Sequence, residues 1–320
     1  MPNTHSTLTA LFTDIASAIR EKDGTSTAKV ADAFPSAIRA IPSGGGSGNE
    51  DAIIEGTISG VYSNSTVSVI QRYRFNNTRL TEVSFENCTS IMASSFTDCK
   101  SLTKAAFPNC QYLENDVFIG CTSLVEVSLP KCSIIYASAF SGCSSLPSMY
   151  LPSCIDIKNG VFKGCTNLKN VNLPECTTIG SSVFYDCQKL SSVSLPKCNN
   201  VGANVFRNCQ SLSEIVLPSC SRIAENAFQY CTKLSTVSLP VCKNISVSAF
   251  KEARMLLSLY LLSPSVCTLQ NSNVFLSTPI AGSTSYTSGV YGSIFVPMSL
   301  LSSYKSATNW TYFSSRFVGV

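Results

Sequence analysis

The sequence predicts a repeat solenoid, a chain that coils through many stacked copies of one short unit. Cysteine occupies fifteen consecutive positions spaced eleven residues apart, from Cys88 to Cys242. Phenylalanine recurs every 22 residues from Phe96 to Phe250, and proline does so from Pro108 to Pro240. The repeating unit is therefore 22 residues long, and a fixed period of this length is typical of solenoids.

Residues 1–42 are expected to form a small α-helical module. Apolar residues from Leu8 to Ile19 follow helical spacing, and a second apolar stripe, interrupted at Pro35, follows after a polar turn. About forty residues bury too little surface to be stable alone, so the module is predicted to dock onto a partner or onto copies of itself. Residues 43–50 are rich in glycine and serine and are predicted to be a flexible linker.

Residues 51–262 are predicted to form the solenoid itself. Each unit reads C-x-x-I-x-x-x-x-F-x-x-C-x-x-L-x-x-V-x-L-P-x and contains the leucine-rich-repeat frame L-x-x-V-x-L-x-x-C-x-x-I. Each rung of this leucine-rich-repeat-type coil is expected to hold a β-strand followed by a turn or short helix. Residues 263–320 lose the period and gain aromatic residues, which predicts an α/β cap that covers the last rung.

One repeat, LPECTTIGSSVFYDCQKLSSVSLPKC, resembles the BspA-type leucine-rich repeats of bacterial surface adhesins, and the resemblance covers residues 60–262. The flanking segments, residues 8–41 and 289–320, are similar to segments that flank such repeats in phage- and prophage-encoded proteins of Gram-positive bacteria. This resemblance implies a non-enzymatic, tail-associated virion protein that recognises a host cell-surface glycan or protein. It also implies a homo-oligomer that contacts other tail proteins through residues 1–42.

Two alternatives stay open: a bacterial cell-surface adhesin of the same family, and a structural subunit of an extracellular filament. The first residues lack a basic region followed by a continuous apolar core, so no secretory signal is expected and synthesis in the cytoplasm is predicted. No apolar stretch is long enough for membrane insertion.

The cysteines are predicted to be reduced and structural. Positions eleven apart lie half a turn from each other in a 22-residue coil, so Cys132 and Cys143 belong to two different columns. Within a column the rungs are about 4.8 Å apart, but parallel side chains do not direct their sulfurs at each other. Scattered disulfides are the alternative, whereas a metal site would need converging thiolates. Phe140, Phe162 and Phe184 are predicted to stack in the core, and neither a metal nor a cofactor is expected.

Charge and motif content argue against catalysis and nucleic-acid binding. The one histidine, His5, lies far from the repeats, so they cannot contain a Ser-His or Cys-His pair. The net charge of +4 is spread along the chain, which predicts no nucleic-acid partner. Glu82 and Glu126 are two rungs apart, roughly 10 Å, with Lys104 between them. This arrangement favours a cross-strand charge ladder over a glycosidase pair.

The outward positions of the V-x-L strands are predicted to form the binding surface, because they are short, polar and mostly uncharged. Tyr150 and Tyr260 are the expected aromatic anchors, with Asn172 and Val216 in the same column. Tyr260 has the alternative role of packing against the cap.

Overall fold

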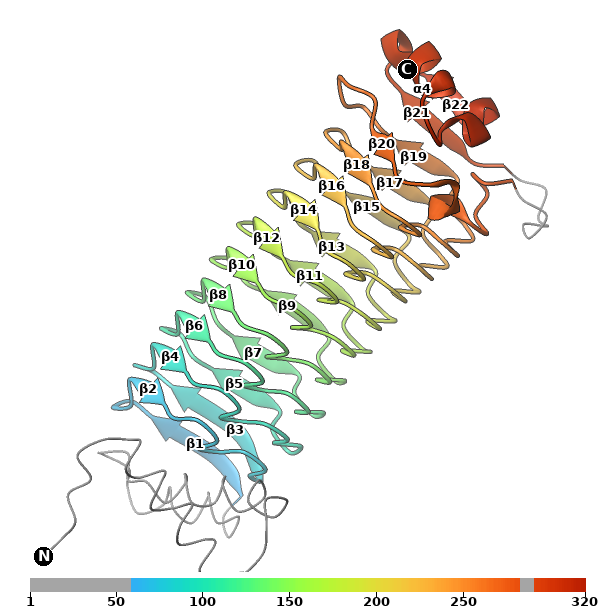
Figure 1. The fold of residues 1–320 in the computed structure, drawn as a ribbon. Coiled ribbons are helices and arrows are strands. Elements are labelled where there is room, and N and C mark those ends of the chain that lie inside the picture. Colours follow the sequence, from blue (N-terminus) through green and yellow to red (C-terminus); the bar gives the residue numbers. More distant parts are fainter. Residues whose placement is uncertain (1–58, 283–290) are drawn as a thin grey trace, which may run out of the picture.

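The chain forms an elongated coil that ends in a cap of short helices, as the sequence predicts (Figure 1). The computed structural model describes residues 59–282 and 291–320. The predicted helical module at 1–42, the linker at 43–50 and the first residues of the predicted solenoid, 51–58, lie outside the described residues.

A parallel β-sheet of ten very short strands runs along one side of the coil (Figure 1). Each strand pairs with the equivalent residues of the next coil, so that Asp156 lies between Ile134 and Thr178. The strands are β2 (Val69–Ile70), β4 (Ser90–Ile91), β6 (Tyr112–Leu113), β8 (Ile134–Ile135), β10 (Asp156–Ile157), β12 (Thr178–Ile179), β14 (Asn200–Val201), β16 (Arg222–Ile223), β18 (Asn244–Ile245) and β20 (Thr268–Leu269).

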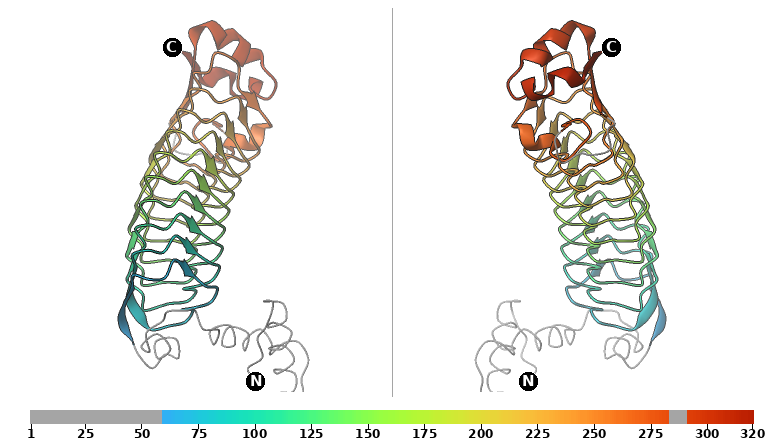
Figure 2. Two further views of the ribbon diagram at one scale, coloured as in Figure 1. Left: turned by 90° about the vertical axis from the view of Figure 1, so that its left-hand side faces the viewer. Right: turned by 90° about the vertical axis from the view of Figure 1, so that its right-hand side faces the viewer.

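The V-x-L segments form a second row of parallel strands on another side of the coil, and Figure 2 shows both rows along its length. Hydrogen bonding divides this row into three sheets, in the orders β1-β3-β5-β7, β9-β11-β13 and β15-β17-β19-β21-β22. The strands are β1 (Gly60–Asn64), β3 (Leu80–Phe85), β5 (Lys104–Ala106), β7 (Glu126–Ser128), β9 (Ser148–Tyr150), β11 (Asn170–Asn172), β13 (Ser192–Ser194), β15 (Glu214–Val216), β17 (Thr236–Ser238), β19 (Ser258–Tyr260), β21 (Ser293–Val296) and β22 (Phe317–Gly319).

Each coil turns sharply around its phenylalanine. The residues two positions before and two positions after the ring have positive φ, for example Ser138 at 57° and Gly142 at 74° around Phe140. Glycine adopts this backbone without strain, whereas serine, asparagine and aspartate tolerate it. The coils between residues 59 and 271 therefore hold turns and no helix, so the turn rather than the short helix joins their strands.

The predicted phenylalanine column is confirmed as the centre of the core. The Phe162 ring is fully buried and stacks on Phe140 and Phe184, with ring centroids 5.5 and 5.6 Å apart. The same stacking continues coil by coil to Phe75 at one end and Phe275 at the other. This column ties neighbouring coils together along the whole array.

The two cysteine columns are also confirmed, and they make different hydrogen bonds. Cys132 donates to the carbonyl of Ile134 in its own coil, at 3.4 Å. Cys143 donates to the carbonyl of Phe118 in the preceding coil, at 3.2 Å. One column therefore closes a turn and the other joins successive coils. All sixteen thiols are free and buried, so each acts as a small apolar side chain with a weak donor.

Mass spectrometry after alkylation tests this thiol arrangement. Iodoacetamide added to protein denatured without reductant is expected to give sixteen adducts, because every thiol is free. The native protein, as the control, is expected to take up few adducts because the thiols are buried and protonated. If the denatured protein has two, four or more adducts fewer than sixteen, it contains disulfides, and the cysteine columns would be contradicted.

The cap begins before the coil ends, because both rows of strands continue past residue 262. Strand β20 pairs with β18, and β21 pairs with β19. Trp310 Nε1 donates to the carbonyl of Cys267 at 2.6 Å, and Cys267 N donates to Tyr304 Oη at 2.9 Å. The remaining elements are η1 (Ser272–Phe275), η2 (Met298–Leu300), α4 (Leu301–Ser306) and η3 (Thr311–Arg316).

Aromatic residues cover the last rung, as predicted. Trp310 and Phe313 pack against Phe275, the final ring of the column, with centroids 6.0 and 5.1 Å away. Tyr304 and Phe317 are also buried, and Tyr304 lies edge-on to Trp310. Tyr291 and Tyr312 are exposed and Tyr286 lies outside the described residues, so only part of the aromatic set forms the cover.

Candidate functional site

The outer face of the V-x-L strands begins with three alternating charges. Lys104 Nζ lies 3.9 Å from a carboxylate oxygen of Glu82 and 3.9 Å from one of Glu126. All three side chains are substantially exposed, so the pairs contribute little to stability. The charge ladder predicted at this end of the array is confirmed, and the lysine separates the two carboxylates.

The middle of the face is polar and carries no charge on β9, β11 or β13. Tyr150 and Asn172 lie side by side because they are paired in register on β9 and β11. Tyr150 is 60% exposed, so its ring is available to a ligand. This pair is the best-defined part of the predicted surface.

Val216 and Tyr260 lie farther along the same column, on β15 and β19. Val216 is 58% exposed, as a contact residue should be. Tyr260 instead stacks on Phe295 of β21, with ring centroids 4.5 Å apart and planes 11° apart. The structure therefore assigns Tyr260 the packing role, and Tyr150 remains the exposed aromatic anchor.

A shallow groove opens on this face where the hydrogen bonding between β13 and β15 stops. It has a volume of about 390 Å³, and its lining includes Ser192, Ser194, Glu214 and Val216. Val193, which would be buried in a continuous sheet, is half-buried here. The repeat pattern continues unchanged across the groove, so nothing in the sequence marks its position.

The other interruption, between β7 and β9, has a direct sequence cause. In neighbouring coils, the residue just before the strand donates its backbone N–H to the previous coil, as Lys169 does to Pro147 O at 2.8 Å. Pro147 has no N–H to donate to the coil before it. A proline in this slot is therefore the signal by which the sequence marks this interruption.

The buried thiols do not form a nucleophilic site. Burial raises the pKa of Cys165 from its ordinary value of 9.0 to about 12, which keeps the thiol protonated at neutral pH. Cys242 differs, because a hydrogen bond from Cys267, with the sulfurs 3.9 Å apart, lowers its pKa. Cys242 and Cys267 are both fully buried, so neither thiol is accessible to a substrate.

Within 59–282 and 291–320, no three histidine, cysteine, aspartate or glutamate side chains converge as metal ligands. No helix in the described part of the chain has both the length and the hydrophobicity needed to cross a bilayer.

The chain belongs to the BspA-type leucine-rich repeat family. The model of the BspA-type leucine-rich repeat region matches six copies over residues 68–175 and 155–280, which is more than half of the sequence. This result confirms the resemblance to BspA-type repeats. Among curated protein sequences, none matches the chain significantly.

Several solved structures of leucine-rich repeat proteins are similar to this chain at low sequence identity. A leucine-rich repeat protein of Treponema pallidum is 22% identical, with a TM-score of 0.43 over 62% of this chain and 83% of its own. One from Bacteroides ovatus is 19% identical, with a TM-score of 0.42 over 81% and 92%. A leucine-rich cell surface protein of Faecalibacterium prausnitzii is 20% identical, with a TM-score of 0.36 over 62% and 77%.

Proposed function

We propose that this chain is a non-enzymatic recognition protein of the adhesin type. Its solenoid would display the V-x-L face to a glycan or protein on a cell surface. The observation that carries the proposal is the uncharged polar surface of β9, β11 and β13, with exposed Tyr150 beside Asn172. Such a surface supplies hydrogen bonds and one aromatic anchor, but no residues suited to proton transfer.

Membership of the BspA-type family supports this function. The position of Lys104 between Glu82 and Glu126 supports the non-enzymatic part of the proposal, since neither carboxylate is left to act alone. The predicted module at 1–42 would attach the array to its carrier and hold copies of the chain together.

Cell binding by a Tyr150→Ser variant tests this proposal. The variant is expected to bind bacterial or animal cells at least about tenfold more weakly than the unchanged protein, because an exposed aromatic anchor is lost. Fluorescently labelled full-length protein and flow cytometry provide the measurement. Tyr312→Ser is the matched control, because Tyr312 is an exposed tyrosine on the cap. Equal binding by all three proteins would contradict the proposed surface.

A tail-associated virion protein is the second candidate. The similarity of residues 8–41 and 289–320 to segments of phage-encoded proteins favours this assignment. Immunogold labelling separates the two settings, since label on the cell envelope supports an adhesin and label on phage tails supports a virion protein. The recognition role of the V-x-L face is the same in both.

A further inference from the structure

A second hollow lies on the opposite row of strands, near the N-terminal end of the array. Its volume is about 500 Å³, and it spans the coils of β2, β4, β6 and β8. The lining side chains are those of Arg72, Ser90, Tyr112, Glu114, Asn115 and Tyr136, called here the Tyr112–Tyr136 groove. It shares no residue with the V-x-L face.

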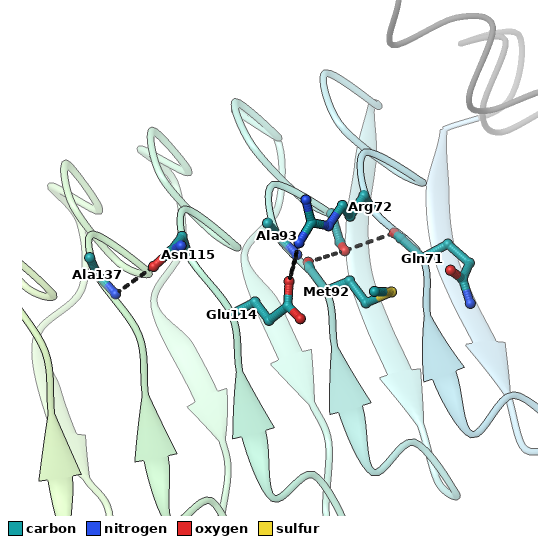
Figure 3. Close-up of polar contacts among 8 residues, drawn as sticks. Gln71, Arg72, Met92, Ala93, Glu114, Asn115 and Ala137 are labelled. Atoms are coloured by element: carbon teal, nitrogen blue, oxygen red, sulfur yellow. Dashed lines mark hydrogen bonds and ion pairs between the residues drawn. The ribbon is translucent and has the colours of Figure 1, made fainter. Parts of the chain in front are cut away.

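Two polar side chains of this groove are held in place by the neighbouring coils, as Figure 3 shows. Glu114 Oε2 accepts from Ala93 N at 3.0 Å and from Arg72 Nη2 at 3.3 Å. Asn115 Oδ1 accepts from Ala137 N at 3.0 Å. Fixed polar groups lose little conformational entropy when a ligand binds.

The same kind of bond joins Asn159 to Ser181 N at 2.9 Å, so the asparagine contact alone is a device of the fold. What distinguishes the groove is the set of hydrogen-bonding groups left over. Within the described residues, Glu114 Oε1, the Asn115 amide nitrogen and the hydroxyls of Tyr112 and Tyr136 have no hydrogen-bond partner. The groove therefore offers both donors and acceptors to a ligand.

The two tyrosines add apolar ring surface to this polar set. Tyr112 is 42% exposed and Tyr136 is 39% exposed. They lie on adjacent coils in diagonal positions, because Tyr112 pairs with Ile134 and Tyr136 follows two residues later. With about 4.8 Å between strands and about 3.3 Å per residue along a strand, their Cα atoms are about 8 Å apart, so a saccharide of two or more rings can contact both. Exposed tyrosines of this kind combine a flat apolar body with a polar tip.

The charges and shape of the groove select the class of ligand. Arg72 and Glu114 neutralise each other, so neither a phosphate nor a strongly basic peptide is favoured. The groove is shallow and open, so it has no deep pocket to enclose an apolar side chain. A sugar ring has apolar C–H faces that stack on tyrosine and hydroxyl groups that both donate and accept.

We propose that the Tyr112–Tyr136 groove binds a neutral saccharide. Sugar rings stack on Tyr112 and Tyr136, and their hydroxyls bond to Glu114, Asn115 and Arg72. This inference extends the proposed function, recognition of a cell-surface ligand, but assigns the ligand class to a different face of the coil.

Isothermal titration of the full-length chain with four neutral hexasaccharides tests the proposal. The probes are maltohexaose, cellohexaose, mannohexaose and chitohexaose with N-acetylated rings. At least one is expected to bind, and Tyr112→Ala with Tyr136→Ala is expected to weaken that binding about tenfold or more through lost aromatic contacts. Tyr312→Ala, at an exposed tyrosine on the cap, is the matched control and is expected to bind unchanged.

A further variant guards against misfolding of the double mutant. Glu114→Gln keeps an oxygen that can accept from Ala93 N but removes the charge, and it is expected to weaken binding by a smaller factor than the double mutant. Binding of none of the four probes, or equal binding by the unchanged and all groove-variant proteins, would overturn the proposal. Heparin is titrated as an anionic comparison, and binding of heparin without binding of any neutral hexasaccharide would overturn the assignment of a neutral saccharide. The assay contains no cells, so its failure is distinguishable from failure of the Tyr150→Ser cell-binding test.

Discussion

Between pH 9 and pH 10 the array is expected to lose stability steeply, because its buried thiols keep their protons in the folded state. Burial raises the pKa of Cys165 and Cys231 from the ordinary value of 9.0 to about 12. The pKa is raised for fourteen of the sixteen cysteines, with burial as the main cause for all but Cys267, where the hydrogen bond to Cys242 comes first.

The direction of the pH effect follows from proton linkage. Below pH 9 the folded and unfolded states both keep the thiol protons, so ionisation does not affect folding. Above pH 9 the unfolded chain releases these protons while the folded chain retains them, and the free energy of unfolding falls until the pH reaches about 12. One pH unit above the thiol pKa of the unfolded chain, each buried thiol lowers the free energy of unfolding by about 1.4 kcal/mol relative to neutral pH. A coil with two such thiols therefore loses about 3 kcal/mol at pH 10.

Urea melts followed by circular dichroism at pH 7.5, 9 and 10, with a phosphine reductant present, measure this effect. The ultraviolet absorbance of cysteine thiolates is expected to rise only as the chain unfolds, because the folded protein keeps its thiols protonated. Cys165→Ala is the control: it should lower stability at pH 7.5 through lost packing, but it should reduce the loss between pH 9 and pH 10. Equal stability of the unchanged protein at all three pH values would contradict the buried thiol columns.

The fold could be predicted in detail because the 22-residue period determines which residues lie next to each other in successive coils. Residues 22 apart occupy the same place in successive coils, so the stacking of Phe140, Phe162 and Phe184 follows from their numbering. The same reasoning placed Lys104 between Glu82 and Glu126. Tyr150 and Asn172 were likewise placed correctly on the outer face of neighbouring strands.

The features that the sequence did not reveal are those that depart from the period. Tyr112 and Tyr136 are 24 residues apart, so a comparison along the 22-residue columns never brings them together, although both line one groove. Cys267 is 25 residues after Cys242, yet its sulfur lies 3.9 Å from that of Cys242. The separation of β13 from β15 falls between two coils whose sequences match the repeat equally well, so the period does not mark it.

Phe162→Ala is expected to lower the free energy of unfolding by about 3–5 kcal/mol, the usual cost of truncating a buried aromatic side chain. The ring is fully buried and stacks on both neighbours, so its removal leaves a cavity and two unsupported rings. Asn172→Ala is the matched control on the next strand, because this side chain is exposed and its loss should change stability by less than about 0.5 kcal/mol. Comparable losses for the two variants would mean that the inner and outer faces have been exchanged.

The distribution of the Phe162→Ala effect along the chain is a second test, since each coil contacts only its neighbours and the array should lose structure locally. The single tryptophan, Trp310, is buried in the cap against Phe275, far from Phe162 along the coil, and its fluorescence reports on the cap. Circular dichroism reports mainly on the strands of the array. In Phe162→Ala the dichroism transition is therefore expected at lower urea concentration than the fluorescence transition, whereas the two coincide more closely in the unchanged protein. Equal shifts of both transitions would show that array and cap unfold as one unit and that the stacked phenylalanines couple the coils over the whole length.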